Sequence, residues 1–120
     1  MVCIVPWNYP LLLMSWKVAS ALAAGNTVVI KPSENTPLST LALADMFSVF
    51  PKGVVNIVSG YGQEIGEPLV RHPKVSKIAF TGGINTGRKI AVLAAEQLKK
   101  VSLELSGNDP LIVCDDVDLE

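Results

Sequence analysis

The segment Thr27-Val28-Val29-Ile30-Lys31-Pro32-Ser33-Glu34 decides the fold that we expect for this chain. Its first half is a continuous apolar run rich in β-branched side chains, which is typical of a strand buried on both faces. Strands of this kind lie in parallel sheets covered by helices, and ligands bind beyond their carboxyl ends. The polar residues that follow the run therefore lie where a binding site is expected.

Similar apolar runs alternate with helical segments along the whole chain. Gly25 is expected to end one helix in a left-handed conformation, and Thr36 to cap the next helix with Pro37 in its first turn. This alternation predicts an α/β fold, a doubly wound and mostly parallel Rossmann-like sheet with helices on both faces. The expected strands cover residues 2–5, 27–30, 54–58, 77–80, 101–105 and 111–114, and the expected helices cover 11–24, 36–50, 63–72 and 86–99.

The composition indicates one domain with a well-filled core, because 49% of the 120 residues are hydrophobic and only 18% are charged. The net charge is −1 without a block of like charges, so binding to nucleic acid or to an anionic membrane is not indicated. Cys3 and Cys114 each lie in an apolar run and are interpreted as buried, reduced thiols. No basic leader is visible, and residues 10–24 are too short to span a bilayer, so we expect a cytoplasmic protein.

Glu104 lies in an apolar run with Val101 and Leu103, just ahead of a turn at Ser106 and Gly107. Desolvation of a carboxylate at the end of a buried strand would make it a stronger base, and a general base that works near pH 7 needs this. The alternative is a glutamate at a strand end that points at water.

The segment Phe80-Thr81-Gly82-Gly83-Ile84-Asn85-Thr86-Gly87 joins an expected strand to an expected helix. Glycines there let backbone N–H groups approach an anion such as a pyrophosphate, and the start of the helix adds positive potential. The G-x-G-x-x-G spacing of the common dinucleotide fingerprint is absent. Gly87 is followed by Arg88-Lys89, not by the Lys-Ser or Lys-Thr of a P-loop, so we exclude an NTPase. An ordinary glycine-rich turn is the alternative.

Two other strand ends carry candidate groups. Lys31 and Glu34 can serve the two hydroxyls of a ribose as donor and acceptor, or form a chance pair in a solvated loop. Asn8 offers a neutral amide donor for a developing oxyanion, or it caps the next helix. His72 has no partner at metal-ligand or triad spacing, and Cys114 is interpreted as a structural thiol, so neither is assigned a function.

Taken in order, these segments closely resemble the NAD(P)-dependent aldehyde dehydrogenase superfamily over essentially all 120 residues. Several separate motifs in the same order and spacing carry the resemblance. They are Pro6-Trp7-Asn8-Tyr9-Pro10, Ala23-Ala24-Gly25-Asn26-Thr27-Val28-Val29, Lys31-Pro32-Ser33-Glu34, Gly53-Val54-Val55-Asn56, Phe80-Thr81-Gly82 with Gly87, and Leu103-Glu104-Leu105-Ser106-Gly107.

The resemblance implies a role for each matched residue. Glu104 corresponds to the general base that activates the deacylating water, and Asn8 to the side-chain donor of the oxyanion hole. Lys31 and Glu34 correspond to the residues that hold the adenosine ribose, where the charge of Glu34 favours NAD and leaves NADP open. Gly83 stands where many members have serine. The implied cofactor-binding residues are Pro6, Trp7, Asn8, Lys31, Ser33, Glu34, Gly62, Gly66, Thr81, Gly82, Gly83, Gly87 and Leu105.

The resemblance also implies that residues 1–120 are a central fragment, mainly the NAD-binding domain, without the catalytic-cysteine domain. In the intact enzyme, expected to be a homo-oligomer, a cysteine thiolate attacks the aldehyde, hydride leaves to NAD, and water releases the carboxylic acid. That cysteine lies downstream of the Glu-Leu-Ser-Gly segment in the family. We therefore expect the 120 residues alone to be inactive.

Two alternatives to this enzyme remain. One is a non-catalytic nucleotide-binding or interaction module that keeps the fold and has lost the reaction. The other is a relative that transfers the acyl group to CoA or phosphate. Glu104 in its full motif argues against the second alternative, because such reactions need no activated water.

Overall fold

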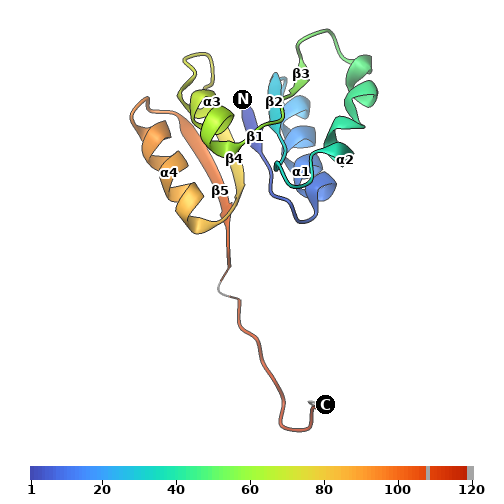
Figure 1. Ribbon diagram of the computed structural model, residues 1–120, viewed down its shortest axis with the longest axis vertical. Helices are drawn as coiled ribbons and strands as arrows, with labels where there is room; N and C mark the ends of the chain where they lie inside the picture. Colours follow the sequence, from blue (N-terminus) through green and yellow to red (C-terminus); the bar gives the residue numbers. More distant parts are fainter. Residues whose placement is uncertain (108, 119–120) are drawn as a thin grey trace.

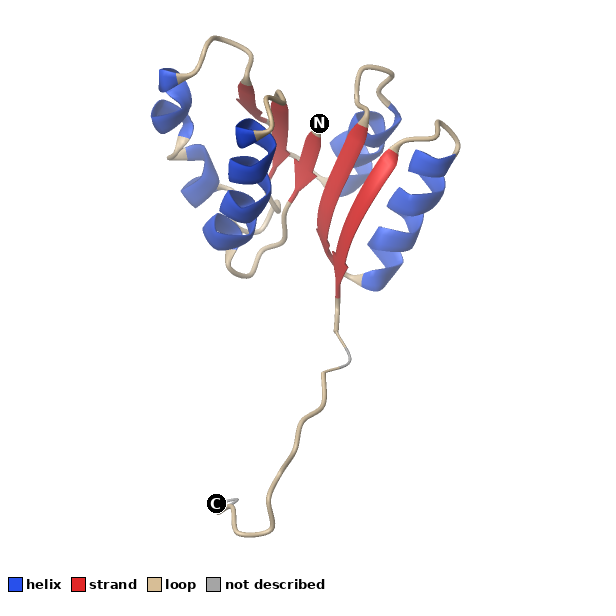
Figure 2. Ribbon diagram, turned by 180° about the vertical axis from the view of Figure 1, so that it is seen from behind, coloured by secondary structure: helices blue, strands red, loops and turns tan. Residues whose placement is uncertain are grey.

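The computed structural model describes residues 1–107 and 109–118, which form one sheet with helices on both sides (Figures 1 and 2). The strands are β1 (Val2–Ile4), β2 (Val28–Lys31), β3 (Val55–Ile57), β4 (Lys77–Gly82) and β5 (Lys100–Leu105). The helices are α1 (Pro10–Ala23), α2 (Leu38–Leu41), the 3-10 helix η1 (Ala44–Val49), the π-helical turn η2 (Gly62–Gly66), α3 (Glu67–Arg71) and α4 (Ile84–Ala95).

The strand order is β3-β2-β1-β4-β5, and every neighbouring pair is parallel. The chain runs outward from β1 to β2 and β3, then crosses to the other side of β1 to form β4 and β5. The order therefore reverses between β1 and β4, where the loops beyond the carboxyl ends diverge and leave a crevice. The predicted doubly wound parallel sheet is confirmed, and its switch point lies at the ends of the two strands that precede Asn8 and Gly83.

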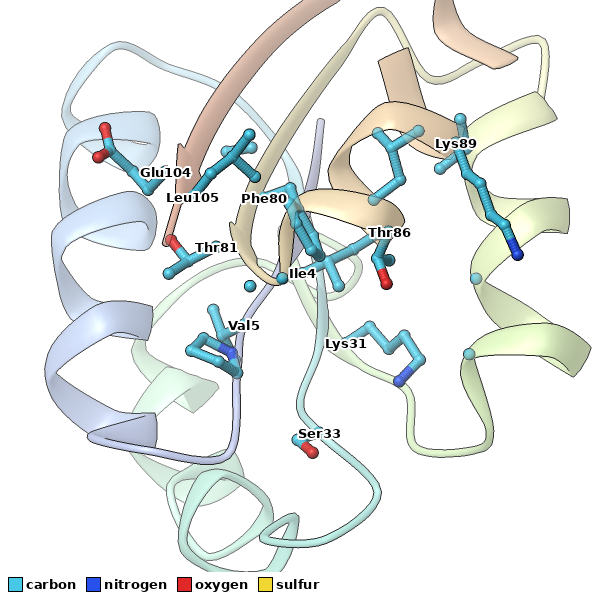
Figure 3. Close-up of a pocket in the computed structure, with 18 of the residues that line it drawn as sticks. Ile4, Val5, Lys31, Ser33, Phe80, Thr81, Thr86, Lys89, Glu104 and Leu105 are labelled. Atoms are coloured by element: carbon cyan, nitrogen blue, oxygen red, sulfur yellow. The ribbon is translucent and has the colours of Figure 1, made fainter. Parts of the chain in front are cut away.

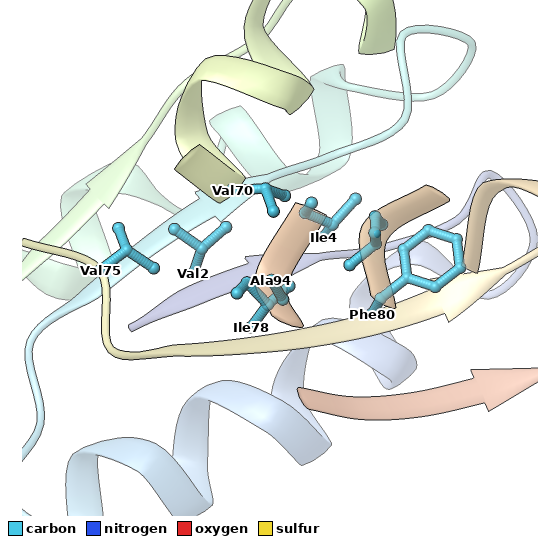
Figure 4. Close-up of a cluster of buried hydrophobic side chains, with 8 residues drawn as sticks. Val2, Ile4, Val70, Val75, Ile78, Phe80 and Ala94 are labelled. Atoms are coloured by element: carbon cyan, nitrogen blue, oxygen red, sulfur yellow. The ribbon is translucent and has the colours of Figure 1, made fainter. Parts of the chain in front are cut away.

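Two hydrophobic cores cover the two faces of the sheet, because successive residues of a strand point to opposite faces. On the side of α3 and α4, the buried cluster shown in Figure 4 contains Val2, Ile4, Val70, Val75, Ile78, Phe80, Ile90 and Ala94. On the side of α1, the buried cluster contains Cys3, Val5, Met14, Val18, Ala21, Val28, Ile30 and Ala79. Both faces of β1 are covered, which explains why its run is wholly apolar.

The predicted helix over residues 36–50 is wrong in its extent, since only α2 and the separate η1 form there. Thr36 does not cap this segment. Its hydroxyl donates to the backbone oxygen of Trp7 at 3.1 Å and ties the β1–α1 loop to the β2–α2 loop. Leu43 and Phe47 pack against the core while Met46 is exposed, and a helix with so little packed surface is marginal in water.

The other helices follow the sequence more closely. α1 is followed by Gly25 with a φ of 74°, which confirms the predicted left-handed stop. The predicted helix over residues 63–72 is divided into η2 and α3. Pro68 lies at the junction, where it has no N–H to donate and its ring crowds the preceding turn. No helix among the described residues is both long and apolar enough to cross a bilayer.

The predicted sixth strand over residues 111–114 is wrong. These residues pair with no strand of the described chain and belong to an extended tail that leaves the body after β5 (Figure 1). Leu111 and Ile112 are exposed, and Cys114, predicted to be buried, is exposed with them. Cys3 is buried as predicted. An apolar run without a neighbouring strand has nothing to pair with and stays extended.

Candidate functional site

A cleft of about 1880 Å³ opens where the strand order reverses. Loops after the strands form its floor, and η2, α3 and α4 contribute to its wall. Thirteen of the fourteen residues that the sequence assigned to the site line this cleft, and Gly87 does not. The lining residues are Pro6, Trp7, Asn8, Lys31, Ser33, Glu34, Gly62, Gly66, Thr81, Gly82, Gly83, Glu104 and Leu105.

Lys31, the last residue of β2, carries a charge and is only 3% exposed. Its Nζ donates to the backbone oxygen of Pro32 at 3.1 Å and to Oε2 of Glu34 at 3.4 Å. The pKa of Glu34 lies below its usual value, chiefly because its carboxylate accepts a hydrogen bond from its own backbone N–H, and further because Lys31 is close. A buried ammonium beside a carboxylate offers a donor and an acceptor to a pair of neighbouring hydroxyls.

A single residue, Gly83, separates β4 from α4. The first turn of α4 has no side-chain cap and no acidic residue, so its backbone N–H groups and the positive end of its dipole are available to a ligand. A Cβ on Gly83 would meet nothing within 4 Å, which shows that the space beside it is open. Gly82 is enclosed, because a Cβ there would lie 2.5 Å from Cζ of Phe80.

Gly87 is buried inside α4 and lies behind this turn. A Cβ on Gly87 would lie 2.5 Å from Cδ2 of Leu105. The missing side chain therefore lets α4 lie close to the end of β5, and Leu105 in turn lines the cleft.

Glu104 pairs in register with Thr81, one residue before Gly82. The burial expected for Glu104 is wrong, since its side chain is exposed. β5 is an edge strand whose Val101 and Leu103 pack against the core on the α4 side. Glu104 alternates with them and points to the other face (Figure 3). The hydroxyl of Thr81 is buried nearby and has no hydrogen-bond partner among the described residues.

Trp7 and Asn8 lie exposed in the loop between β1 and α1. Tyr9 is the residue before α1 and has a left-handed conformation with a φ of 49°. No side chain caps α1, so the alternative role of Asn8 as a helix cap is not found. Asn8 is exposed and lines the cleft, so its side chain is accessible to a ligand.

The polar groups of the cleft lie on two sides of the sheet (Figure 3). Lys31 and Thr86 are on the side of α3 and α4, whereas Thr81 and Glu104 are on the side of α1. A ligand that reaches both sides must be long and must pass the N-terminus of α4, where an anionic group is favoured. The unpartnered hydroxyl of Thr81 and the open space beside Gly83 fit such a molecule.

The family model described as "Aldehyde dehydrogenase family" matches residues 1–120. The chain belongs to the aldehyde dehydrogenase family. Betaine aldehyde dehydrogenase 1 of Oryza sativa subsp. japonica is 55% identical over 119 residues, which cover 98% of this chain and 24% of that protein. Phenylacetaldehyde dehydrogenase of Pseudomonas fluorescens is 54% identical over 117 residues, which cover 96% of this chain and 23% of that protein.

A solved structure gives the same result. The crystal structure of betaine aldehyde dehydrogenase from Staphylococcus aureus in complex with NAD+ matches with a TM-score of 0.90 and 46% identity, over 98% of this chain and 24% of that one. The chain thus spans about a quarter of the length of the relatives that it matches. The family model and the relatives confirm the resemblance to aldehyde dehydrogenases, and the solved structure confirms the fold.

Most of the lining residues that lie on helices were not predicted from the sequence. They come from α1, η2, α3 and α4, and on α4 the helical spacing of residues 86, 89, 90 and 93 was the available signal. Arg88-Lys89 was considered only as a departure from a P-loop. The missed lining residues include Gln63, Glu64, Glu67, Arg88, Lys89, Val92 and Leu93.

Proposed function

We propose that this chain is the cofactor-binding portion of a longer aldehyde dehydrogenase and that it binds NAD across the carboxyl edge of its sheet. The observation that carries the proposal is that Lys31, with its ion-pair partner Glu34, lies on the side of α3 and α4, whereas Glu104 lies on the side of α1. The Gly83 turn joins β4 to α4 in the same cleft. A dinucleotide has a ribose at one end, a pyrophosphate in the middle and a reactive ring at the other end, which matches this order of groups.

Each part of NAD has a candidate partner in the cleft. The adenosine ribose hydroxyls bind Lys31 and Glu34, and the negative charge of Glu34 disfavours the 2′-phosphate of NADP. The pyrophosphate lies at the N-terminus of α4 beside Gly83. The nicotinamide end lies toward Thr81 and Glu104, where the buried Thr81 hydroxyl gains a hydrogen-bond partner. Pro6, Trp7, Ser33, Gly62, Gly66 and Leu105 complete the contact surface.

In the longer enzyme, the residues of this chain serve a reaction whose nucleophile comes from elsewhere. The amide of Asn8 donates to the oxygen of the aldehyde as a thiolate adds to its carbonyl carbon. NAD, when bound, accepts a hydride from that carbon, which leaves a thioester. The Glu104 carboxylate then takes a proton from a water that attacks the thioester and releases the acid. The exposure of Glu104 in this chain gives water access to it.

The described residues place no thiolate in the cleft. Cys3 is buried beneath α1, and burial raises the pKa of its thiol to about 11. Cys114 lies in the tail after β5. We therefore predict that the 120 residues bind NAD without oxidising an aldehyde. The same observation favours the second candidate function, a nucleotide-binding module without catalysis.

We further propose a reducing compartment such as the cytoplasm, and a homo-oligomeric intact enzyme. The compartment is supported by the two cysteines, which are both free and differ in burial. Relatives with chloroplastic and peroxisomal names show that the family also occurs in other compartments. The aldehyde itself stays unassigned.

The proposal is tested by calorimetric titration of the 120-residue chain with NAD. Lys31→Ala and Glu34→Ala remove the ribose partners and should each weaken NAD binding by about tenfold or more, because a charged hydrogen bond to the ligand is lost. Lys52→Ala, a change at an exposed lysine in the loop before β3, is the control and should bind like the wild type. A folded wild-type chain without measurable NAD binding would overturn the proposal. If Lys31→Ala and Glu34→Ala both bind NAD as tightly as the wild type, NAD binds outside this cleft.

A further inference from the structure

We propose that Arg71, Glu96 and Lys99 act as a clasp between α3 and α4 that positions the cleft wall for the adenine half of NAD. The proposal rests on the proposed function and adds positioning residues to it. None of the three side chains lines the cleft. They act through the distance between the two helices that do line it.

The cleft wall on this side consists of η2 and α3 facing α4. Residues of both elements line the same cleft, namely Glu67 and Val70 of α3 and Val92 and Leu93 of α4, and the two helices are in contact. A flat base that enters this cleft touches both helices. Its contact area therefore depends on how closely α3 is held to α4.

α3 is too short to keep a fixed orientation without contacts to the rest of the fold. It has five residues, which is too short for a stable helix in water, and it continues from a π-helical turn that contains two glycines. Val70 is its fully packed side chain, and Leu69 is only partly buried. Additional contacts are needed to fix its orientation.

The clasp supplies those contacts from the far side of the cleft. Nε of Arg71 donates to Oε1 of Glu67 within α3 at 2.8 Å, and Nη1 donates across to Oε2 of Glu96, just beyond α4, at 2.5 Å. Nζ of Lys99 donates to the backbone oxygens of Val70 at 2.5 Å and His72 at 2.7 Å. Lys99 therefore binds the carbonyl of Val70 in the last turn of α3 and that of His72 just beyond it, where a cation is also favoured by the helix dipole. The His72 carbonyl also accepts from the backbone N–H of Val75 at 2.9 Å.

Lys99 is the stronger half of the clasp. An exposed ion pair such as Arg71–Glu96 contributes little because water competes for both partners. Lys99 is partly withdrawn from water, and this desolvation lowers the pKa of its ammonium group. Its two acceptors are main-chain oxygens at the end of a short helix. Removal of the ammonium leaves the His72 oxygen with the Val75 N–H and takes the Lys99 donor from the Val70 oxygen, which frees the end of α3.

The experiment compares three ligands on the 120-residue chain by calorimetry: NAD, AMP as the adenine half, and nicotinamide mononucleotide as the other half. Lys99→Met keeps the length of the side chain and removes the donor. We expect NAD and AMP to bind about three- to tenfold more weakly, because part of their binding free energy is then used to order the cleft wall. The affinity for nicotinamide mononucleotide should not change. Lys99→Arg should restore binding, Glu96→Gln should show a smaller loss, and Lys52→Met is the matched control.

Several outcomes would overturn the clasp. If Lys99→Met binds AMP as tightly as the wild type, the clasp does not position the adenine half. If all three ligands lose the same affinity, the variant is generally destabilised and the cleft wall is not specifically positioned by Lys99. If the wild type binds no NAD, the proposed function fails, and amide hydrogen exchange decides on the clasp alone. Lys99→Met should then accelerate amide exchange in residues 67–72 without affecting α1. Equal exchange rates of residues 67–72 in the variant and the wild type would contradict the clasp.

Discussion

Two apolar runs of this chain look alike and behave differently. Val2-Cys3-Ile4-Val5 and Leu111-Ile112-Val113-Cys114 each hold three aliphatic residues and a cysteine, and both were predicted to be buried strands. The first run forms β1 in the middle of the sheet, and Cys3 is 0% exposed. The second run leaves Leu111 89% and Ile112 83% exposed.

The difference lies in the neighbours and not in the composition. β1 is paired in register with β2 on one side and β4 on the other, and helices cover both of its faces. Residues 111–114 have no paired strand in the described part of the chain. An apolar run indicates that burial of its side chains would be favourable. Whether they are buried depends on the neighbouring strands and helices that the rest of the fold provides.

The largest contrast is expected between the two thiols. At pH 8 the Cys3 thiol, whose pKa is raised to about 11 by burial, is ionised to only about one part in a thousand and is covered by α1. Cys114 is exposed to reagent. We predict that iodoacetamide modifies Cys114 at least about a hundredfold faster than Cys3, measured by mass spectrometry of timed digests. Equal rates would show that the sheet opens readily, and the rates should converge in denaturant.

The two isoleucines of these runs give the next contrast. Ile4→Ala should lower the free energy of unfolding by about 2–5 kcal/mol, because it leaves a void in the core on the α4 side. Ile112→Ala should change it by about 0.5 kcal/mol or less, because the side chain is already in water. Urea unfolding followed by circular dichroism measures both values. A similar loss in the two variants would mean that residues 111–114 are packed in solution.

The same distinction explains how much of the fold was predictable. All five strands of the described residues were found to within two residues. The signal is most direct for β1, β2 and β4, because strands buried on both faces leave continuous apolar runs that can be recognised without knowing their partners. The helix predicted over residues 36–50 and the strand predicted over residues 111–114 were wrong, because the structure of both segments depends on packing partners elsewhere in the chain. Strand order, which decides whether a run is central or at an edge, cannot be obtained from local sequence.

The candidate site divides along the same line. The sequence placed Lys31 and Glu104 correctly at strand ends, because carboxyl ends of parallel strands share one edge. It did not show that Lys31 would be buried and Glu104 exposed. Lys31 ends β2, which has a strand on both sides, whereas Glu104 lies on the edge strand β5.

Two neighbouring glycines sharpen the comparison within the site. Gly82→Ala should destabilise the fold by about 1–3 kcal/mol, since its Cβ would lie 2.5 Å from Cζ of the buried Phe80 ring. Gly83→Ala adds a methyl group in open space at an ordinary φ of −67° and should have no more than about 0.5 kcal/mol effect on stability. Thermal unfolding of the two variants tests this. An equal cost would mean that the region around Gly83 is filled in solution.

The smallest effect is expected at the carboxylate of Glu34. The pKa of Glu34 in the folded chain lies below its ordinary value of 4.5, first because of its hydrogen bond with the backbone and then because of Lys31. A lowered pKa in the folded state contributes stability above pH 4.5, and this contribution is lost as the pH falls through the folded value. Because the Glu34 side chain is 40% exposed, water screens the interaction to about 0.5 kcal/mol or less.

Glu34→Gln should therefore flatten the acid side of the stability profile by this small amount, measured by urea unfolding from pH 6 to pH 3. An acid profile of Glu34→Gln that is as steep as that of the wild type would contradict the lowered pKa of the Glu34 carboxyl.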